Sequence, residues 1–565
     1  MKRFFASEKK EKRIASGASV LLIGSIVAKM LGALYRIPLT NILGAEGMGM
    51  YQLVFPVYAL FMVLATAGVP TALSRTVAEK RAMGEDTKKY LKIAMPALVV
   101  SGVIFASIMA AMSRFLAEKQ GNAETYPGFL IIAPSIVLVC VISGFRGWFQ
   151  GEMYMLPTAL SNVVEQAVKL SVGLGVSFAL AKRGVLYAVC GALFGVTASE
   201  VATVIYMLAT YLVRLKKERK REVLPRIAKK VGVEDERKNN ICNDISEETA
   251  SKQKHKISKA ELKGLFHVAL PIAAVAILMP IASFFDSVII VNMLKAFGLE
   301  KSVATAQYGI LSGPVNSLIN MPVVAIMSLA VAIVPSVSAS RVTKDIDGVM
   351  IKSSLCVRLA YLLGIPFAFF LAVFSKNIIG LIYPDLSSQD MQVAVNVLLI
   401  SSANVVFLSV MQIYVSLLQS LDKTKYAVVS LVAAIVVKIV SDVLLTKYIG
   451  INGAAIASLA LPTVAYLGTL VSYYKICGLR LEKNVGLNLV SGVIMALCGI
   501  AIKSFAKSDI VALGVGIIVC AIIYVWLAFL LNLVGKDDIP HLPLKKLLWA
   551  LHRTIRFWEY NNETR

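Results

Sequence analysis

Two lysines, Lys169 and Lys438, lie near the middle of two of the longest apolar stretches in this chain. Each follows a glutamine, Gln150 or Gln419, by 19 residues. An uncompensated charge at that depth in a bilayer costs about 3 kcal/mol on insertion scales. A chain that carries such a charge in two matched places is expected to use it. The matched spacing also predicts an internal duplication with an offset of 269 residues.

Each of these lysines has an acidic residue one helical turn away. Glu165 precedes Lys169 and Asp442 follows Lys438, both at the i,i+4 spacing that places side chains on one helix face. In one interpretation these pairs are structural and fix helix packing. In the other they face a water-filled cavity between the two halves, where the lysines bind an anionic headgroup and the acids hold a coupling ion. Other charges also fall inside the apolar stretches, and five of them are further candidates: Lys29, Arg36, Arg146, Glu200 and Asp286.

The elements that must position these charges are membrane-spanning helices. Hydrophobic residues make up 57% of the chain and charged residues 16%, with a mean hydropathy of +0.73. Runs of about 20 apolar residues span a bilayer as helices, whereas strands of a membrane barrel would be shorter and alternate in polarity. We therefore predict an all-α polytopic membrane protein with fourteen transmembrane helices. The predicted spans are roughly 17–40, 51–70, 91–112, 127–149, 157–181, 185–213, 264–293, 309–337, 352–374, 392–418, 426–445, 451–474, 485–502 and 510–534.

The distribution of basic residues predicts the topology. The net charge of +24 would suit a nucleic-acid partner, but most of the 58 Lys and Arg fall in alternate loops and in both tails. Positive residues accumulate on the cytoplasmic side of membrane proteins. We therefore expect a multi-pass protein of the bacterial cytoplasmic membrane, with both termini cytoplasmic and 113–126 and 375–391 facing outward. We expect contact with anionic lipids and none with nucleic acid.

The predicted spans divide into two pseudo-symmetric lobes of six helices plus two extra helices. Residues 1–213 form the first lobe and 264–475 the second, with the same orientation in the membrane because six spans precede the second lobe. Three segments complete the chain: a basic cytoplasmic linker, predicted to be disordered, at 214–263, spans 13 and 14 at 476–534, and an amphipathic cytoplasmic tail at 535–565.

An enzymatic function is not predicted. None of the four histidines lies deep in a predicted span, and the chain has no GxxxxGK[ST] phosphate loop. No cofactor is expected, and transport would depend on a Na⁺ or H⁺ gradient or on the membrane potential. The seven cysteines show no paired spacing typical of disulfides or of a zinc site.

Three stretches resemble the stage V sporulation protein B and YtgP group, a MurJ/MviN-like branch of the multidrug/oligosaccharidyl-lipid/polysaccharide exporter superfamily. They are NILGAEGMGMYQLVFPVYALFMVLATAGVPTALSRTVAEK at 41–80, GFRGWFQGEMYMLPTALSNVVEQ at 144–166, and YGILSGPVNSLINMPVVAIMSLAVAIVPSVSASR at 308–341. The resemblance implies two lobes around a central cavity and a lipid-facing groove formed by spans 13 and 14. It also implies substrate-binding cations, which Lys29 and Arg36 match in span 1. An acid and a basic residue of the MurJ branch have no match in GMGMYQLVF and ALFMVLATAG.

From these observations we predict a flippase for an undecaprenyl-pyrophosphate-linked saccharide, such as lipid II or a related polysaccharide precursor, acting as a monomer in cell-wall or sporulation processes. The predicted cavity cations are Lys29, Arg36, Arg146, Lys169 and Lys438, and the predicted charge partners are Glu165, Glu200, Asp286 and Asp442. The alternatives are an ion-coupled multidrug or metabolite antiporter and a non-transporting scaffold for wall or spore cortex synthesis. The resemblance implies a metal cation between Asp286 and Asp442. Because Lys438 lies one turn before Asp442, we predict that its ammonium takes the place of that ion.

Overall fold

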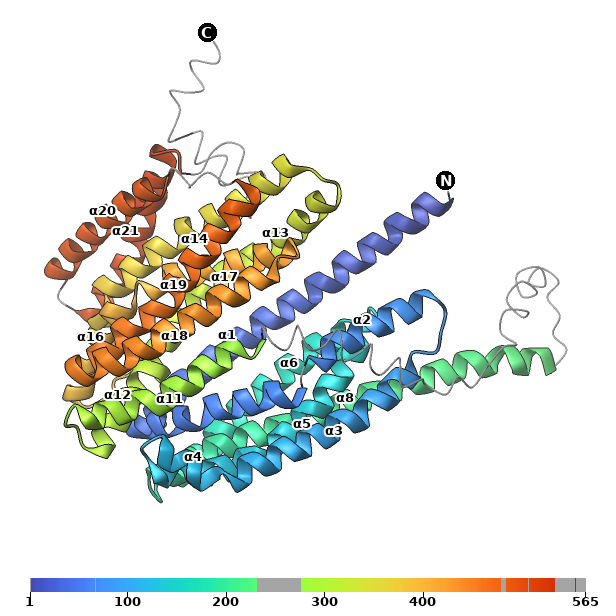
Figure 1. Cartoon of the computed structure of the whole chain (residues 1–565), viewed down its shortest axis with the longest axis horizontal. Helices are drawn as coiled ribbons and strands as arrows, with labels where there is room; N and C mark the ends of the chain where they lie inside the picture. Colours follow the sequence, from blue (N-terminus) through green and yellow to red (C-terminus); the bar gives the residue numbers. More distant parts are fainter. Residues whose placement is uncertain are drawn as a thin grey trace, which may run out of the picture.

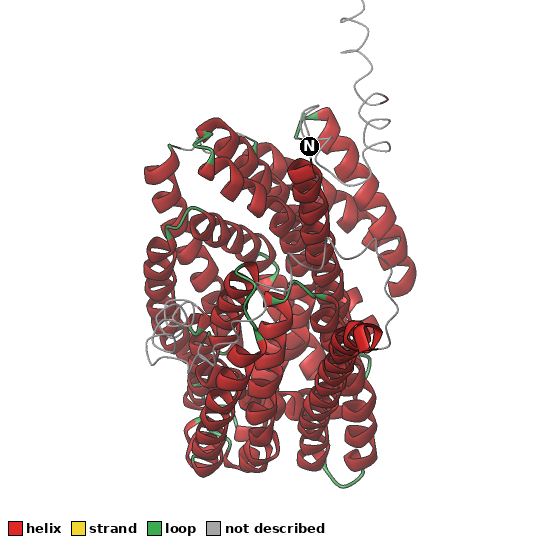
Figure 2. Cartoon of the chain, turned by 90° about the vertical axis from the view of Figure 1, so that its right-hand side faces the viewer, coloured by secondary structure: helices red, strands yellow, loops and turns green. Residues whose placement is uncertain are grey.

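The computed structural model describes residues 2–66, 68–230, 276–478, 484–506 and 508–533, together with Thr554. Every regular element in these ranges is a helix (Figure 2). Twelve helices are long and apolar enough to cross a membrane, and a bent pair, Ser388–Ser401 with Asn404–Ser420, raises the number to thirteen. The all-α membrane fold predicted from composition is therefore confirmed.

The predicted count of fourteen spans is not confirmed, and the difference lies at the start of the chain. The first predicted span falls within α1, Lys2–Thr66, and the second, 51–70, lies mostly within it; α1 is interrupted at Gly44. Gly44 has φ +67° and ψ −176°, a backbone conformation that glycine adopts without a steric penalty. One long element thus turns back on itself at this glycine and passes on to α2, Val69–Ala82.

The rest of the first lobe packs around α1 and the central helix α5. It comprises α3 (Lys88–Ala111), α4 (Ser113–Lys119), η1 (Ala123–Thr125), α5 (Tyr126–Gly151), α6 (Leu156–Val168), η2 (Lys169–Gly173), α7 (Leu174–Ala181) and α8 (Val185–Lys230). Its core is filled by large apolar side chains such as Trp148, Phe129 and Phe149, all essentially inaccessible to solvent. The element η2 is a single π-helical turn, a feature often found at functional sites.

The second lobe has its own core and carries two additional helices. It comprises α11 (Leu278–Ala296), α12 (Lys301–Ile310), η3 (Leu311–Val315), α13 (Asn316–Val342), α14 (Ile346–Val373), α15 (Ser375–Ile382), α16 (Ser388–Ser401), α17 (Asn404–Ser420), α18 (Thr424–Ile449) and α19 (Ile451–Cys477). The additional helices α20 (Val485–Phe505) and α21 (Asp509–Leu530) pack beside α14 and α15.

Two segments predicted to lie outside the membrane differ from expectation or cannot be compared. Residues 214–230 continue α8 as a helix, so the beginning of the predicted disordered linker is ordered. Its remainder to 263 falls outside the described residues. So does the predicted amphipathic tail at 535–565, apart from Thr554.

The two lobes meet at one end of the molecule. Figure 1 shows them converging around α4, α11 and α12 and diverging toward the N-terminus of α1. At the converging end Asn122 Nδ2 donates to Thr305 Oγ1 (3.2 Å), and Gln120 Nε2 donates to Ser287 Oγ (2.7 Å). The Lys301 ammonium pairs with Glu124 at 2.6 Å. This end includes 113–126, which the charge distribution predicts to face outward.

Close backbone contact accompanies these polar contacts. Gly49 of α1 lies against Thr305 of α12, and a Cβ at Gly49 would come within 2.0 Å of the Thr305 carbonyl oxygen. Gln52 Nε2 donates to the carbonyl of Ser312 at 2.8 Å. These contacts join the two lobes, so the converging end is closed both by close packing and by hydrogen bonds.

Candidate functional site

Lys169 lies in the π-helical turn η2 and is surrounded by aromatic rings. Its ammonium is 5.3 Å from the ring centroid of Tyr35 and 5.1 Å from that of Phe55, both on α1. A cation over an aromatic face is attracted by the negative face of the ring, at about 0.5–2 kcal/mol per contact. Within the described ranges Lys169 forms no ion pair. The rings therefore hold the charge in place without neutralising it.

The turn that carries Lys169 is held close to α8 by two glycines. A Cβ at Gly195 would come within 2.2 Å of the Gly173 Cα, so only glycine permits this approach. The contact places η2 directly against α8 and leaves Lys169 on the side of α1.

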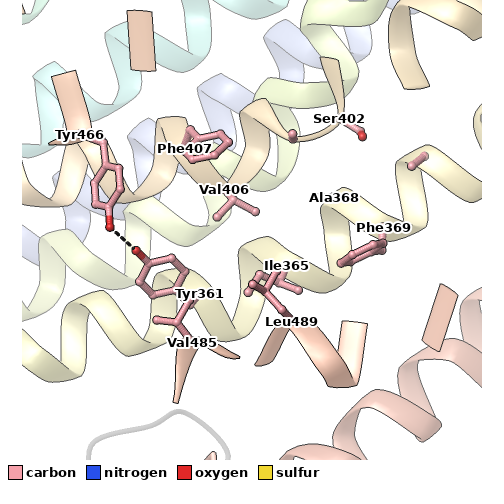
Figure 3. A pocket seen from close by; sticks show the side chains of 12 residues that line it. Tyr361, Ile365, Ala368, Phe369, Ser402, Val406, Phe407, Tyr466, Val485 and Leu489 are labelled. Atoms are coloured by element: carbon pink, nitrogen blue, oxygen red, sulfur yellow. Dashed lines mark hydrogen bonds between the residues drawn. The ribbon is translucent and has the colours of Figure 1, made fainter. Parts of the chain in front are cut away.

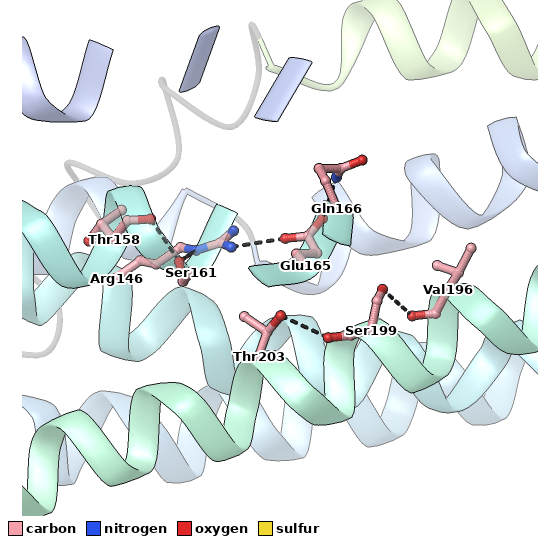
Figure 4. A network of polar contacts seen from close by, with 8 residues as sticks. All are labelled: Arg146, Thr158, Ser161, Glu165, Gln166, Val196, Ser199 and Thr203. Atoms are coloured by element: carbon pink, nitrogen blue, oxygen red, sulfur yellow. Dashed lines mark hydrogen bonds and ion pairs between the residues drawn. The ribbon is translucent and has the colours of Figure 1, made fainter. Parts of the chain in front are cut away.

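Glu165 pairs with an arginine and not with Lys169 (Figure 4). Arg146 Nη2 donates to Glu165 Oε2 at 2.9 Å, and Arg146 Nε donates to Ser161 Oγ at 3.0 Å. Gln166 Nε2 donates to the other carboxylate oxygen of Glu165 at 3.2 Å. The sequence predicted that Glu165 could neutralise Lys169 within one helix. The structure instead brings Arg146 from α5 to Glu165, so this expectation was wrong and Glu165 forms no ion pair with Lys169.

Of the remaining predicted residues of the first lobe, Glu200 lies beside this cluster. Glu200 on α8 is 5% exposed and interacts electrostatically with Glu165, Arg146 and Lys169. Arg36 on α1 reaches the second lobe, where its Nη1 donates to Ser317 Oγ at 3.2 Å. Lys29 lies on α1, and its side chain is outside the described part of the structure. The cluster thus adjoins the surface on which α1 meets the second lobe.

In the second lobe Lys438 is bound between two carboxylates. Its ammonium donates to Asp442 Oδ2 at 2.7 Å on its own helix α18 and to Asp286 Oδ1 on α11. The side chains of Lys438 and Asp442 are 7% and 0% exposed, whereas Asp286 is 26% exposed. The predicted i,i+4 pairing is therefore present here, with Asp286 as a third member.

The two lysines occupy similar places in their lobes. The α6–η2 segment packs against α1 and α8, just as α18 packs against α11 and α19. Lys169 accordingly meets α1, and Lys438 meets α11, each of which is the first described helix of its lobe. The partners are rings in one lobe and carboxylates in the other. The lobes share a framework but differ in charge.

The second lobe contains an apolar cavity of about 390 Å³ (Figure 3). The sequence did not predict which residues line it. Its walls come from α14, α17, α19 and α20, and include Ile365, Phe369 and Leu489. At one end the hydroxyls of Tyr361 and Tyr466 form a hydrogen bond of 2.9 Å. The resemblance implied a lipid-facing groove formed by spans 13 and 14. Span 13 corresponds to α20, which forms part of the wall of this cavity.

The chain has two lobes that share a framework and converge at one end, and both carry charged residues within apolar helices. These are the features of a two-lobe membrane transport protein. Comparison with known proteins identifies the family. The chain belongs to the polysaccharide biosynthesis protein family, whose model matches residues 14–341.

Two proteins of Bacillus subtilis are similar over nearly the full length. Stage V sporulation protein B is 27% identical over 549 residues, covering 94% of this chain and 97% of the relative. The lipid II flippase MurJ is 25% identical over 509 residues, covering 87% of this chain and 88% of the relative. The suspected family resemblance is therefore confirmed.

Solved structures show the same fold. A lipid II flippase MurJ in an inward closed conformation matches with a TM-score of 0.66 at 13% identity, covering 90% of this chain and 97% of that structure. A MATE family multidrug resistance transporter of the MOP superfamily matches with a TM-score of 0.62 in its inward-facing conformation, at 16% identity and 80% and 95% coverage. Homology to stage V sporulation protein B and to the lipid II flippase MurJ supports a transport protein and not an enzyme. The chain is a multi-pass membrane protein of the flippase and exporter class.

Proposed function

We propose that this protein moves an undecaprenyl-pyrophosphate-linked saccharide, lipid II or a related polysaccharide precursor, from the inner to the outer leaflet by alternating access of its two lobes. The observation that carries the proposal is the charge state around Lys169. Arg146 pairs with Glu165, and the Lys169 ammonium, held by Tyr35 and Phe55, forms no ion pair in the described structure, so it can bind an anionic group. A diphosphate supplies such a group, and the low dielectric at this depth strengthens the attraction.

The apolar cavity supports a lipid-linked substrate. A polyprenyl chain needs an apolar surface, and the walls of this cavity, formed largely by α14, α17 and α20, are almost entirely apolar. In this proposal the chain lies along these helices while the saccharide diphosphate crosses between the lobes. The contacts at the converging end correspond to an inward-facing state if, as the basic residues predict, this end faces outward.

Complementation tests this function. The unmodified gene and a Lys169→Gln variant are expressed in a bacterium depleted of its lipid II flippase, and growth and outer-leaflet precursor are measured. Arrival in the outer leaflet is followed with an externally added enzyme that cleaves the lipid-linked precursor. Rescue by the unmodified protein but not by Lys169→Gln is the expected result. Failure to rescue, combined with increased drug resistance on expression, would instead support the multidrug antiporter alternative.

A further inference from the structure

The ammonium of Lys438 occupies the centre of the acidic pair in the second lobe. It hydrogen bonds to Asp442 on α18 at 2.7 Å and to Asp286 on α11, so one cation bridges two helices. The lysine is 7% exposed and Asp442 is fully buried. The family resemblance implies that a metal cation binds between these two carboxylates.

A metal ion does not fit beside this lysine. Hard cations are bound by several oxygens at about 2.0–2.6 Å, which requires both carboxylates to turn toward the ion. Here both carboxylates turn toward an ammonium, whose positive charge would repel the metal. Among the described helices that pack against α18, α17 bears no charged residue and the one charge on α19 is Lys475 in its last turn, so neither supplies a replacement acid. Over the described residues no group of three or more His, Cys, Asp or Glu side chains is placed to hold a metal.

We propose that Lys438 is a built-in cation that replaces an exchangeable metal ion in the second lobe, so that this protein works without sodium. Two buried acceptor oxygens lie on the same helix as Lys438. Asp442 Oδ1 and Thr446 Oγ1, one turn apart on α18, have no hydrogen-bond partner among the described residues. Once the lysine is removed, these oxygens and Asp286 can ligate a small cation. The inference concerns the ion and not the transported substrate, so it stands apart from the proposed function.

Thermal unfolding of the purified protein in detergent tests this idea without a transport assay. The melting temperature is measured in sodium chloride and in choline chloride at equal ionic strength. The unmodified protein should melt at the same temperature in both salts. The Lys438→Ala variant should melt at a lower temperature in choline and recover as sodium is added, with saturation, because a ligand that binds only the native state stabilises it.

Two control variants locate the effect. Lys438→Ala combined with Asp286→Asn should lose the sodium response, and Lys169→Ala should not gain one because Lys169 forms no ion pair within the described ranges. A saturable sodium shift in the unmodified protein that Asp442→Asn abolishes would overturn the proposal, and this measurement needs no lysine variant to fold. A Lys438→Ala protein that melts identically in both salts would overturn it as well.

Discussion

Lys169 and Lys438 lie at similar positions in the two lobes but contact different kinds of side chain. The Lys438 charge is balanced by two carboxylates, whereas Lys169 forms no ion pair in the described structure and lies over the faces of Tyr35 and Phe55. Of these two lysines, we therefore propose the one in the first lobe as the ligand of an anionic substrate. This difference arises from the neighbouring helices and not from the lysines or their spacing.

Replacing Lys169 should impair transport without impairing the fold. Lys169→Gln removes a charge-assisted contact worth about 1.5–3 kcal/mol, which corresponds to a loss of roughly ten- to a hundredfold in transport. Because Lys169 forms no ion pair in the described structure, the melting temperature should fall only by the small amount that loss of its contacts with Tyr35 and Phe55 accounts for. Both quantities are measured on one preparation, by flipping in proteoliposomes and by thermal unfolding. Lys425→Gln, at an exposed site at the start of α18, serves as the matched control. Normal transport by Lys169→Gln would refute the substrate-binding role.

Arg146 should behave in the opposite way. Arg146→Gln leaves Glu165 without its cation and should destabilise the protein by roughly 1–3 kcal/mol. This is less than the cost of breaking a fully buried pair, because 23% and 22% of the two side chains are exposed. The double variant Arg146→Gln/Glu165→Gln should recover most of the lost melting temperature. A double variant that is no more stable than Arg146→Gln alone would show that the pair is not coupled.

At the scale of the element, the sequence predicted the helices well and their partners poorly. Apolar runs of about 20 residues are a local signal, and most of the predicted spans coincide with observed helices. The i,i+4 pair of Lys438 and Asp442 is also local and is present. In contrast, Asp286 is 152 positions from Lys438, and Tyr35 and Phe55 approach Lys169 only because α1 turns at Gly44. No local pattern contains such contacts, so the wrong partner was assigned to Glu165.

Two glycines near η2 should respond to alanine with opposite signs. Gly195→Ala would drive a methyl group into Gly173 of η2, with a cost of roughly 1–3 kcal/mol for overpacking. It should also lower transport, because the displaced turn carries Lys169. Gly175→Ala, in the adjacent helix α7, meets no atom within 4 Å and should raise stability by about 0.5–1 kcal/mol through helix propensity. Melting temperatures of the two variants check the prediction. An equal response at both sites would contradict the close contact between η2 and α8.

At the scale of the whole molecule, the orientation in the membrane determines which state this structure represents. Single cysteines at Ser251 and Ser387, in a background without the seven native cysteines, should react differently with an impermeant thiol reagent in intact cells. The cysteine at 387 should be labelled, because 375–391 is predicted to face outward. The cysteine at 251, in a segment outside the described residues, should be protected until the cells are permeabilised. Labelling at 251 from outside would reverse the orientation and make the converging end cytoplasmic.

Alternating access requires the converging end to open. In the described structure this end is held by contacts between the lobes, among them the exposed ion pair of Glu124 with Lys301. If substrate leaves through this end, a covalent bridge across it must stop transport. Cysteines at both positions, joined by a short cleavable bifunctional reagent, should reduce flipping to background, and cleavage of the reagent should restore it.

A matched control separates the closing of this end from chemical damage. Arg75 and Glu79 form an exposed ion pair of 3.0 Å within the single helix α2, so a bridge between cysteines at these sites does not join the lobes. The same reagent should leave transport by that variant unchanged. Flipping at the full rate while 124 and 301 remain bridged would contradict the model, because the two lobes would then carry substrate across without separating where they now meet.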